Sequence, residues 1–520
     1  MQNSFNSNSR LEEQFKVIVK KYPKQIAISC NGLDLTYEEL DQKSDLVANL
    51  VKNNLTEDTE YVGLLMDRGL EMVISVLGIL KAGVAYIPID PVNNPTERIK
   101  LCLSEVNLKL LITDRTIDIT NVKTLFIGED TLNEQAQLSA REIIPAKKSK
   151  IAYAIFTSGT TGIPKAVPIK HENVLNMFNN SQEIFEFTKA DVWALFHSIA
   201  FDFSVWEIWG TLLYGARLEI VPYAVAKNTA RFRRFLVEKK ISVLNQTTGA
   251  FYTLIKVDQS KESKIDSLRC LIFGGEKLDI QLLEPWINRY SSSSKLITVY
   301  GTTETTIFTT FKNISHKDLI INKLSPIGKP IPGSDIVLVG EENEIATRGE
   351  IYISGERLSD GYLNKFDLNQ TKFISKTVLG KTVKYYRTGD LAYEKNGEFY
   401  FLGRVDSQVK FNGYRIELEG IESITMSHPK IMRSIAFVDN TLAYPRLINF
   451  LEPIDKLPVE HESSILNEVK NLAESLLPFY MVPSEFVFID TIPLTTNGKI
   501  DHQKLSEISK SFVHKFSVAN

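Results

Sequence analysis

The segment Phe156–Lys165 (FTSGTTGIPK) combines residue types that could hold the phosphate groups of a nucleotide. It follows the apolar run Ile151–Phe156, which is typical of a buried strand. Gly159 and Gly162 let the backbone approach a ligand closely, and Lys165 supplies a countercharge. The spacing is not that of a P-loop. A Ser/Thr/Gly-rich surface loop is the alternative that this segment alone leaves open. The hydroxyl donors belong to Thr157, Ser158, Thr160 and Thr161.

The elements that must position this segment alternate between strand-like and helix-like patterns. Thr36–Glu39 has the pattern of a capping box that opens a helix, and Glu71–Lys81 is expected to be helical. Such alternation predicts parallel sheets with helices on both faces. Apolar runs that predict strands are Tyr61–Leu65, Ala85–Ile89, Leu108–Thr113, Ile151–Phe156, Ala194–His197, Ile241–Asn245 and Leu268–Phe273.

The pattern changes after Gly328 to short strands joined by tight Gly/Asn turns, which predicts a smaller β-rich subdomain. A compact α+β pattern follows Asp406. The sequence therefore predicts an α/β fold with a large N-terminal domain, residues 1–405, of helix-flanked sheets plus the β-rich subdomain. A small α+β C-terminal domain, residues 406–520, follows it.

Composition limits the classes of function. The 520 residues exceed what one hydrophobic core holds, and the 43% apolar and 24% charged content are ordinary for a globular protein. The net charge of -3 argues against a nucleic-acid or anionic-membrane surface, and no run approaches the roughly 18 apolar residues of a membrane helix. Cys30, Cys102 and Cys270 lie far apart in apolar runs, so we expect reduced core cysteines and a cytoplasmic protein.

Five further motifs follow the glycine-rich segment in order. They are FDFSVWEIW (201–209), VYGTTE (299–304), YRTGDL (386–391), GRVDSQVKFNGYRIE (403–417) and TTNGKID (495–501). Together they resemble the adenylation domains of nonribosomal peptide synthetases, within the superfamily of acyl-CoA synthetases and luciferases. The resemblance runs from the first helix to about Asp501.

The resemblance implies a reaction in two halves. A carboxylate attacks the α-phosphorus of ATP to give an acyl-adenylate and pyrophosphate, and a thiol then displaces AMP to form a thioester. Because the carboxylate is already a nucleophile, catalysis should rest on positioning and on neutralising phosphate charge. The implied cofactors are ATP and Mg²⁺, with phosphopantetheine on a partner carrier protein.

The resemblance assigns nucleotide roles to single residues. Lys165 and the neighbouring hydroxyls would hold the departing phosphates, Glu304 would bind Mg²⁺, and Thr303 would bond the α-phosphate. Tyr300 matches the aromatic residue that stacks on adenine, and Asp390 matches the acceptor for the ribose hydroxyls. The remaining nucleotide-binding positions are Gly275, Gly301 and Arg404.

The C-terminal motifs imply a mobile domain. Lys499 would reach the carboxylate and the α-phosphate in the first half-reaction, whereas a solvated lysine in an Asn-Gly turn is the alternative from sequence alone. Asp406 would be the hinge about which the small domain rotates, and Lys410 would then serve thioester formation.

Asp202 decides the class of substrate. In family members that activate amino acids, an aspartate at this place pairs with the substrate's α-ammonium group, and a buried carboxylate requires a cationic partner. A helix N-cap before Val205–Leu213 is the alternative role. Asn245 is the polar member of an otherwise mostly bulky and apolar pocket, which implies a small side chain with one hydrogen-bonding group. The pocket resembles the family's threonine-selecting set except at Val299, Ile307 and Phe308, and this resemblance implies threonine or a similar small hydroxy amino acid. The other pocket positions are Phe203, Trp206, Ile272, Gly274, Val299, Ile307 and Phe308.

Several alternatives stay open. An acyl-CoA or aryl-acid ligase of the same superfamily is disfavoured by Asp202, a D-alanine–carrier protein ligase is a near variant, and a non-catalytic binding module would not need all of these charged groups. We expect a free-standing enzyme whose carrier protein is supplied in trans, unless the chain is part of a larger synthetase. A small activating protein is a further partner that the resemblance allows.

Overall fold

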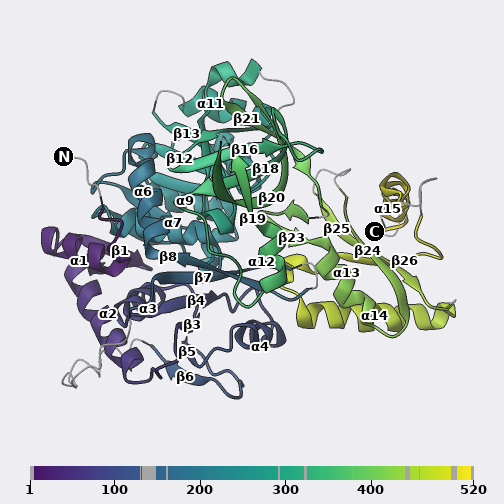
Figure 1. Ribbon diagram of the computed structural model, residues 1–520, viewed down its shortest axis with the longest axis horizontal. Helices are drawn as coiled ribbons and strands as arrows, with labels where there is room; N and C mark the ends of the chain where they lie inside the picture. The colour runs from purple at the N-terminus through teal and green to yellow at the C-terminus, as the bar shows by residue number, and fades with distance from the viewer. Residues whose placement is uncertain are drawn as a thin grey trace. The chain divides into compact units, whose positions relative to one another are not determined.

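The computed structural model describes residues 5–128, 130–131, 148–159, 162–290, 293–320, 325–378, 380–406, 408–439, 445–455, 457–493 and 500–516. The chain forms two compact units (Figure 1). The first unit comprises Met1–Pro91, Leu103–Phe156 and Ala166–Val405. The second comprises Val92–Cys102, Thr157–Lys165 and Asp406–Asn520. Among the described residues, no helix has the length and apolarity that crossing a bilayer requires.

A six-stranded sheet forms from the first third of the chain, in the order β6-β5-β3-β4-β7-β8. The pairs β3–β4, β3–β5, β5–β6 and β4–β7 are parallel, as their apolar runs predict. The strands are β3 (Tyr61–Leu65), β4 (Ala85–Ile89), β5 (Leu110–Thr113), β6 (Lys123–Phe126), β7 (Ile151–Thr157) and β8 (Lys165–Lys170). The helices nearby in sequence are α1 (Leu11–Lys21), α2 (Tyr37–Lys52), α3 (Leu70–Lys81) and α4 (Thr96–Glu105).

Local sequence explains how these helices begin and pack. The Thr36 hydroxyl accepts the Glu39 N–H at 3.2 Å, and the Glu39 carboxylate accepts the Thr36 N–H at 2.8 Å, so the predicted capping box opens α2. Nearly every residue of α3 is buried, which is the property of a helix covered on all sides.

A longer hydrogen-bonded path joins the parallel sheet to the β-rich part, in the order β17-β16-β18-β20-β21-β15-β14-β13-β12-β11-β9-β10-β1-β2. Strands β9 to β13 and β1 pair in parallel, whereas β14 onward pair antiparallel. The strands before the change are β1 (Ile26–Cys30), β2 (Leu33–Thr36), β9 (Val192–Leu195), β10 (Arg217–Ile220), β11 (Val243–Thr247), β12 (Cys270–Gly274) and β13 (Lys295–Tyr300).

The antiparallel strands form the β-rich part of the first unit, and β19 pairs with β20 at its side. These strands are β14 (Thr310–Asn313), β15 (Ser325–Pro330), β16 (Ser334–Val339), β17 (Ile345–Ala346), β18 (Arg348–Gly355), β19 (Phe373–Val378), β20 (Lys381–Lys395) and β21 (Glu398–Arg404). The helical elements of this unit after β8 are α6 (His171–Phe185), α7 (Asp202–Leu212), α8 (Tyr223–Ala226), α9 (Thr229–Glu238), α10 (Thr248–Gln259), η2 (Ile280–Leu283), α11 (Glu284–Tyr290), η3 (Thr303–Thr305), η4 (His316–Ile320) and α12 (Phe366–Lys372).

The second unit carries a hairpin and a three-stranded sheet, beside which α13 and α14 lie (Figure 1). Its own core includes the buried residues Ile416, Ile421 and Ala473. The elements are β22 (Gln408–Phe411), β23 (Tyr414–Glu417), α13 (Leu418–Met426), β24 (Ile431–Asp439), β25 (Arg446–Pro453), α14 (Val459–Leu476), η5 (Phe479–Met481), β26 (Glu485–Phe488) and α15 (His502–Phe516).

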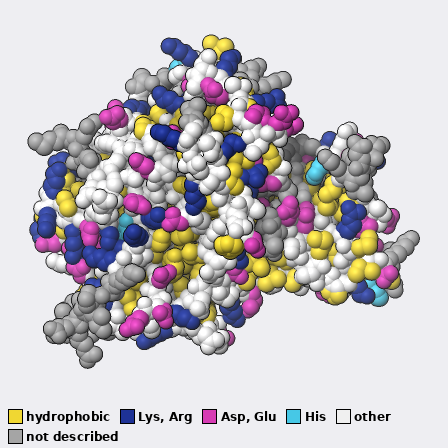
Figure 2. Space-filling view, viewed as in Figure 1, with side chains coloured by type: hydrophobic (Ala, Val, Ile, Leu, Met, Phe, Trp, Pro, Cys, Tyr) yellow, Lys and Arg dark blue, Asp and Glu magenta, His cyan; other side chains and the backbone are white. Residues whose placement is uncertain are grey.

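The predicted α/β class, with helix-flanked parallel strands before the β-rich part and a small α+β region after it, is confirmed. Cys30, Cys102 and Cys270 are free and buried, as expected. Charged side chains of both signs are interspersed over the face shown in Figure 2, in keeping with the small net charge.

Five of the predicted strands (β5, β7, β9, β11 and β12) have bounds that differ by one or two residues from the prediction, and two of these differences have a visible cause. Strand β9 ends at Leu195 instead of His197, because the N–H groups of Phe196 and His197 donate to the Glu207 carboxylate and leave the strand ladder. Strand β11 spans Val243–Thr247 instead of 241–245, since its pairing with β12 continues to Gly274.

Candidate active site

A buried polar cluster in the first unit contains three of the predicted nucleotide-binding residues. Tyr300 ends β13, and its hydroxyl donates to Asp390 Oδ2 at 2.7 Å. Arg404 pairs with the other carboxylate oxygen and donates to the Thr388 carbonyl at 3.1 Å. Burial, followed by the nearby Asp390 charge, raises the pKa of Tyr300 well above its usual range, so its hydroxyl stays a donor. The cluster holds the aromatic ring and the carboxylate in one fixed arrangement.

Two glycines next to this cluster are required by local geometry. Gly275 follows β12 with a φ of +87°, a conformation that favours glycine. A Cβ on Gly301 would lie 2.2 Å from the Ile307 carbonyl oxygen, so no larger residue fits there. Thr306 and Ile307 also adopt positive φ values of 59° and 68°. A β-branched residue in this region is strained, and such strain is typical of functional sites.

Asp202 lies in the same unit, beside η3. Its carboxylate accepts a hydrogen bond from Thr303 and interacts electrostatically with Glu304 and His197. Burial raises the pKa of Asp202 to about 6, and the hydrogen bond from Thr303 offsets this only in part. The folded protein therefore disfavours an unpaired negative charge at this position. A bound cation would stabilise the ionised carboxylate.

The alternative role of Asp202 as a helix N-cap is wrong. Phe201 is the N-cap of α7, with no side-chain capping bond, and Asp202 is the first helical residue. A carboxylate in the first turn still interacts favourably with the helix dipole.

Aromatic side chains form the wall next to Asp202. The Phe308 ring meets Phe203 and Trp206 edge-on, with centroids 5.0 and 5.1 Å apart. Trp206 also stacks on Phe178 of α6 at 4.8 Å, and all of these rings are buried. Three predicted pocket residues thus contact one another in a bulky apolar wall.

Asn245 is the polar exception among the predicted pocket residues. It is fully buried on β11, opposite Ile272 of β12, and neither its side-chain oxygen nor its nitrogen has a hydrogen-bond partner among the described residues. Gly274 and Val299 form the next part of this wall, as register partners on β12 and β13. A buried amide without partners is costly, which makes Asn245 a candidate ligand-binding group.

Glu304 has the donor chemistry expected of a magnesium ligand. The side chain is completely buried in the η3 turn, and its Oε1 accepts the Tyr362 hydroxyl at 2.7 Å. Its carboxylate and the adjacent Thr303 hydroxyl are hard oxygen donors of the kind that Mg²⁺ prefers. The residues present therefore fit the ion.

Residues Thr157–Lys165 of the glycine-rich segment belong to the second unit. Within that unit, Ser158 Oγ donates to the Arg415 carbonyl at 3.1 Å, and Lys165 Nζ lies 3.3 Å from Glu417 Oε1. Thr157 ends β7, and its hydroxyl donates to the Lys165 carbonyl at 3.4 Å. Gly159 and Gly162 are buried, whereas Thr160 and Thr161 lie outside the described residues.

Two further predicted residues lie in or next to the second unit's hairpin. Asp406 is the first residue of the Asp406–Asn520 portion, and Lys410 lies on β22 opposite Arg415. Lys499 lies outside the described residues.

Reasoning from the sequence missed a buried pair close to Asp202. His197 and Glu207 contact each other through Nδ1 and Oε1 at 2.8 Å, and both side chains are buried. The signal that could have found them is a histidine and a glutamate five residues to either side of Asp202. Tyr362, which contacts Glu304, and Glu417, which contacts Lys165, were also missed.

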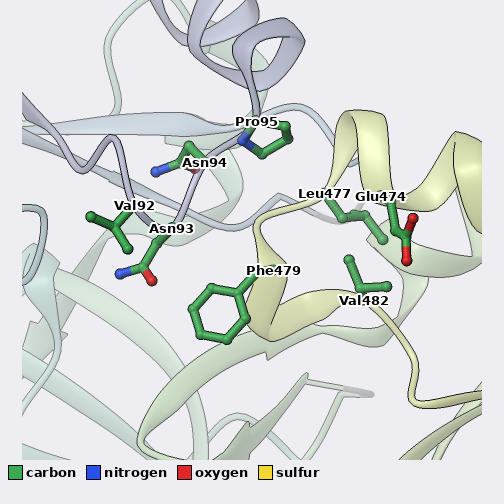
Figure 3. Close-up of a pocket in the computed structure, with 8 residues that line it drawn as sticks. All are labelled: Val92, Asn93, Asn94, Pro95, Glu474, Leu477, Phe479 and Val482. Carbon is green, nitrogen blue, oxygen red and sulfur yellow. The ribbon is translucent and has the colours of Figure 1, made fainter. Parts of the chain in front are cut away.

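A cavity of about 520 Å³ in the second unit lies apart from the predicted site residues (Figure 3). Near it, the Phe479 N–H donates to the Asn93 carbonyl at 3.1 Å. None of the predicted site residues lines this cavity, whose lining residues are Val92, Asn93, Asn94, Pro95, Glu474, Leu477, Phe479 and Val482.

The order of motifs and the clustered residues agree with the comparison to known families. The family described as AMP-binding enzyme matches residues 15–363, and the AMP-binding enzyme C-terminal domain matches residues 420–499. The chain belongs to the AMP-binding enzyme family. The resemblance on which the residue roles depend is therefore confirmed at the level of the family.

Two proteins with similar sequences are described as synthases. Syringomycin synthase SyrB1 from Pseudomonas syringae pv. syringae is 36% identical over 504 residues, which cover 95% of this chain and 81% of that protein. A dimodular nonribosomal peptide synthase from Bacillus subtilis (strain 168) is 35% identical over 95% of this chain. This chain spans only 21% of that relative's length.

Among solved structures, PA1221 is described as an NRPS protein containing adenylation and PCP domains. Its holo form, bound to a vinylsulfonamide inhibitor, matches with a TM-score of 0.81 at 25% identity. The match covers 95% of this chain and 84% of that one.

Proposed function

We propose that this chain activates an amino acid with ATP and transfers the aminoacyl group to a thiol. In the first half-reaction, an oxygen of the substrate carboxylate bonds to the α-phosphorus of ATP, and pyrophosphate leaves. In the second, the thiol sulfur loses its proton to solvent and bonds to the carbonyl carbon, the bond to AMP breaks, and AMP leaves with its electron pair. The family membership supports the adenylating chemistry.

Asp202 is the observation that carries the choice of an amino acid. Its pKa is raised to about 6 chiefly by burial, and it lies next to Thr303 and Glu304 of the motif that the resemblance assigns to ATP and Mg²⁺. An α-ammonium group would neutralise this carboxylate next to the carboxylate that reacts. An acid without an amine would leave Asp202 unpaired.

The nucleotide roles remain proposals for single residues. The Tyr300 ring would stack on adenine, and Asp390 would accept the ribose hydroxyls from its position between Tyr300 and Arg404. Lys165 would bind the departing phosphates in place of its present partner Glu417. Lys499 would contribute the second cation, Asp406 the hinge, and Glu304 the magnesium ligand. Magnesium bound there would neutralise phosphate charge.

Asn245 supports threonine, or a similar small hydroxy amino acid, as the substrate. A side-chain hydroxyl both donates and accepts, so it could pair with each of the two unpartnered atoms of this amide. The bulky wall of Phe203, Trp206 and Phe308 favours a small substrate side chain. Valine would leave Asn245 unpaired, and such sites can discriminate by roughly 10⁴.

A carrier protein with a phosphopantetheine thiol is the acceptor that we propose. PA1221 combines adenylation and PCP domains, and syringomycin synthase SyrB1 is similar over most of its length. A small activating protein is a second proposed partner.

Amino-acid-dependent ATP–pyrophosphate exchange tests this function. The assay compares the twenty common amino acids with the 2-hydroxy acids and aryl acids of similar size. We expect exchange with threonine first, serine about 10- to 200-fold lower, and valine lower still. Exchange that is stronger with an acid lacking an amine contradicts amino-acid activation, and a preference for valine over threonine contradicts the role of Asn245.

A further inference from the structure

His197 and Glu207 form a buried pair for which the adenylation chemistry above has no use. Glu207 lies on α7 (Figure 1), and its side chain is completely buried. Its Oε2 accepts the N–H groups of Phe196 and His197, each at 3.2 Å, and its Oε1 lies 2.8 Å from His197 Nδ1. One carboxylate therefore anchors both the backbone and the ring of His197.

This arrangement determines the tautomer of His197. A carboxylate that already accepts two N–H groups acts as an acceptor toward the ring as well, so Nδ1 carries the proton. With the proton on Nδ1, a neutral imidazole has its lone pair at Nε2. That atom is buried and has no hydrogen-bond partner among the described residues. A buried acceptor held this rigidly is costly unless a donor reaches it.

The ring belongs to the wall of the proposed amino-acid pocket. It stacks on Phe203 with centroids 4.7 Å apart and an interplanar angle of 21°. Phe203 in turn contacts Phe308, and Phe203 follows Asp202 directly in the chain. His197 also lowers the pKa of Asp202, a smaller effect than that of burial. The unpartnered Nε2 and the carboxylate disfavoured by burial thus belong to neighbouring side chains of the proposed pocket wall.

We propose that His197 Nε2 is a second acceptor for the α-ammonium group of the substrate, beside Asp202, and that Glu207 is the positioning residue that holds it. An ammonium group has three N–H donors, and one carboxylate does not satisfy all of them. A neutral imidazole adds an acceptor without adding a second negative charge near the ATP phosphates. This inference rests on the proposed amino-acid activation and deepens it.

Two substitutions separate this role from a merely structural one. His197→Asn keeps a side-chain N–H in the place of Nδ1 for Glu207 and removes Nε2. His197→Gln places a polar atom near the position of Nε2 and weakens the contact with Glu207. If His197 contacts the substrate, His197→Asn should be the variant with impaired amino-acid activation. If His197 only supports the structure through Glu207, His197→Gln should be the more impaired variant.

The measurement is steady-state pyrophosphate exchange with the preferred amino acid, together with thermal unfolding of each variant. For His197→Asn we expect the KM for the amino acid to rise roughly ten- to a hundredfold, the range for a lost hydrogen bond to a charged group. The KM for ATP should change less than about twofold, since the nucleotide cluster of Tyr300 and Asp390 is untouched. His197→Gln should recover much of the loss.

The matching 2-hydroxy acid is an internal control, because a hydroxyl replaces the ammonium group. The ratio of kcat/KM for the amino acid to that for the hydroxy acid should fall at least tenfold in His197→Asn. This ratio is independent of the fraction of folded enzyme. An unchanged ratio, or a glutamine variant that is more impaired than the asparagine variant, overturns the proposal.

The outcome is distinguishable from failure of the proposed function. If the unsubstituted protein exchanges pyrophosphate with no amino acid, amino-acid activation itself is wrong. If the unsubstituted protein exchanges pyrophosphate with an amino acid and His197→Asn does so equally well, only the proposed role of His197 is wrong.

Discussion

Replacing Asp202 by asparagine should make the protein more stable and less active at the same time. The carboxylate has a pKa raised from 3.8 to about 6, chiefly by burial. At about 1.36 kcal/mol per pH unit, this shift corresponds to about 3 kcal/mol against ionisation in the folded protein. Partial exposure of the side chain to solvent screens the charge, so about 1–3 kcal/mol is the expected range.

The sign of the pH dependence follows from the raised value. The contribution of Asp202 to stability is fully present below pH 3.8 and is lost as the pH rises through about 6. At pH 8 the wild-type protein therefore carries an unfavourable charge that asparagine lacks, whereas near pH 4 the two proteins should be almost equally stable. Denaturant unfolding at both pH values measures this difference.

Activity should change in the opposite direction. Removing one partner of a buried ion pair costs roughly 3–5 kcal/mol, so the kcat/KM for the amino acid should fall by about 10²- to 10⁴-fold while the KM for ATP stays the same. Asp335→Asn, an exposed carboxylate on β16, is the matched control and should change neither property. An Asp202→Asn protein that is less stable at pH 8, or that keeps its amino-acid KM, refutes the reasoning.

Three further predictions concern single groups. In the wild-type protein, kcat/KM for the amino acid should fall about tenfold per pH unit below about pH 6, because only ionised Asp202 binds the ammonium group. In Asp202→Asn, the pH profile of kcat/KM should no longer show this fall. Asn245→Leu should raise the free energy of unfolding by about 1–3 kcal/mol by removing an unpartnered amide, and should bring the exchange rates with threonine and valine to within about tenfold of each other. Tyr300→Phe should raise the KM for ATP about tenfold, because Asp390 loses the hydroxyl group that holds it in position, and the KM for the amino acid should not change. A smaller change in the KM for ATP than in the KM for the amino acid contradicts the nucleotide role.

Local sequence patterns correctly predicted the helix starts and strand bounds that are determined by residues close together in the chain. The capping box at Thr36 opens α2, and the apolar runs at Tyr61–Leu65 and Ala85–Ile89 are strands with those same bounds. Each of these signals depends on residues within a few positions of one another. The errors lie where a distant partner decides the outcome: β9 stops early because Glu207, on the next helix, takes its N–H groups.

The residues of the candidate site show the same division. Chain order and residue type were enough to indicate the glycine-rich segment, Asp202, Glu304 and Asp390, because their chemistry is a property of the side chains. Their contacts were not predictable in this way. Tyr362 reaches Glu304, and Arg404 reaches Asp390, only because strands and turns distant in sequence fold together.

The amino-acid sequence alone was enough to identify the family and the chemical groups available for catalysis, since both are recorded in motif identity and order. Tertiary structure alone decided which of those groups are paired and which are not. Burial raises the pKa of Asp202, the amide of Asn245 has no partner among the described residues, and Glu207 holds the ring of His197. The reason is physical: desolvation and hydrogen-bond satisfaction depend on what surrounds a group in space, and the surrounding residues come from distant parts of the chain.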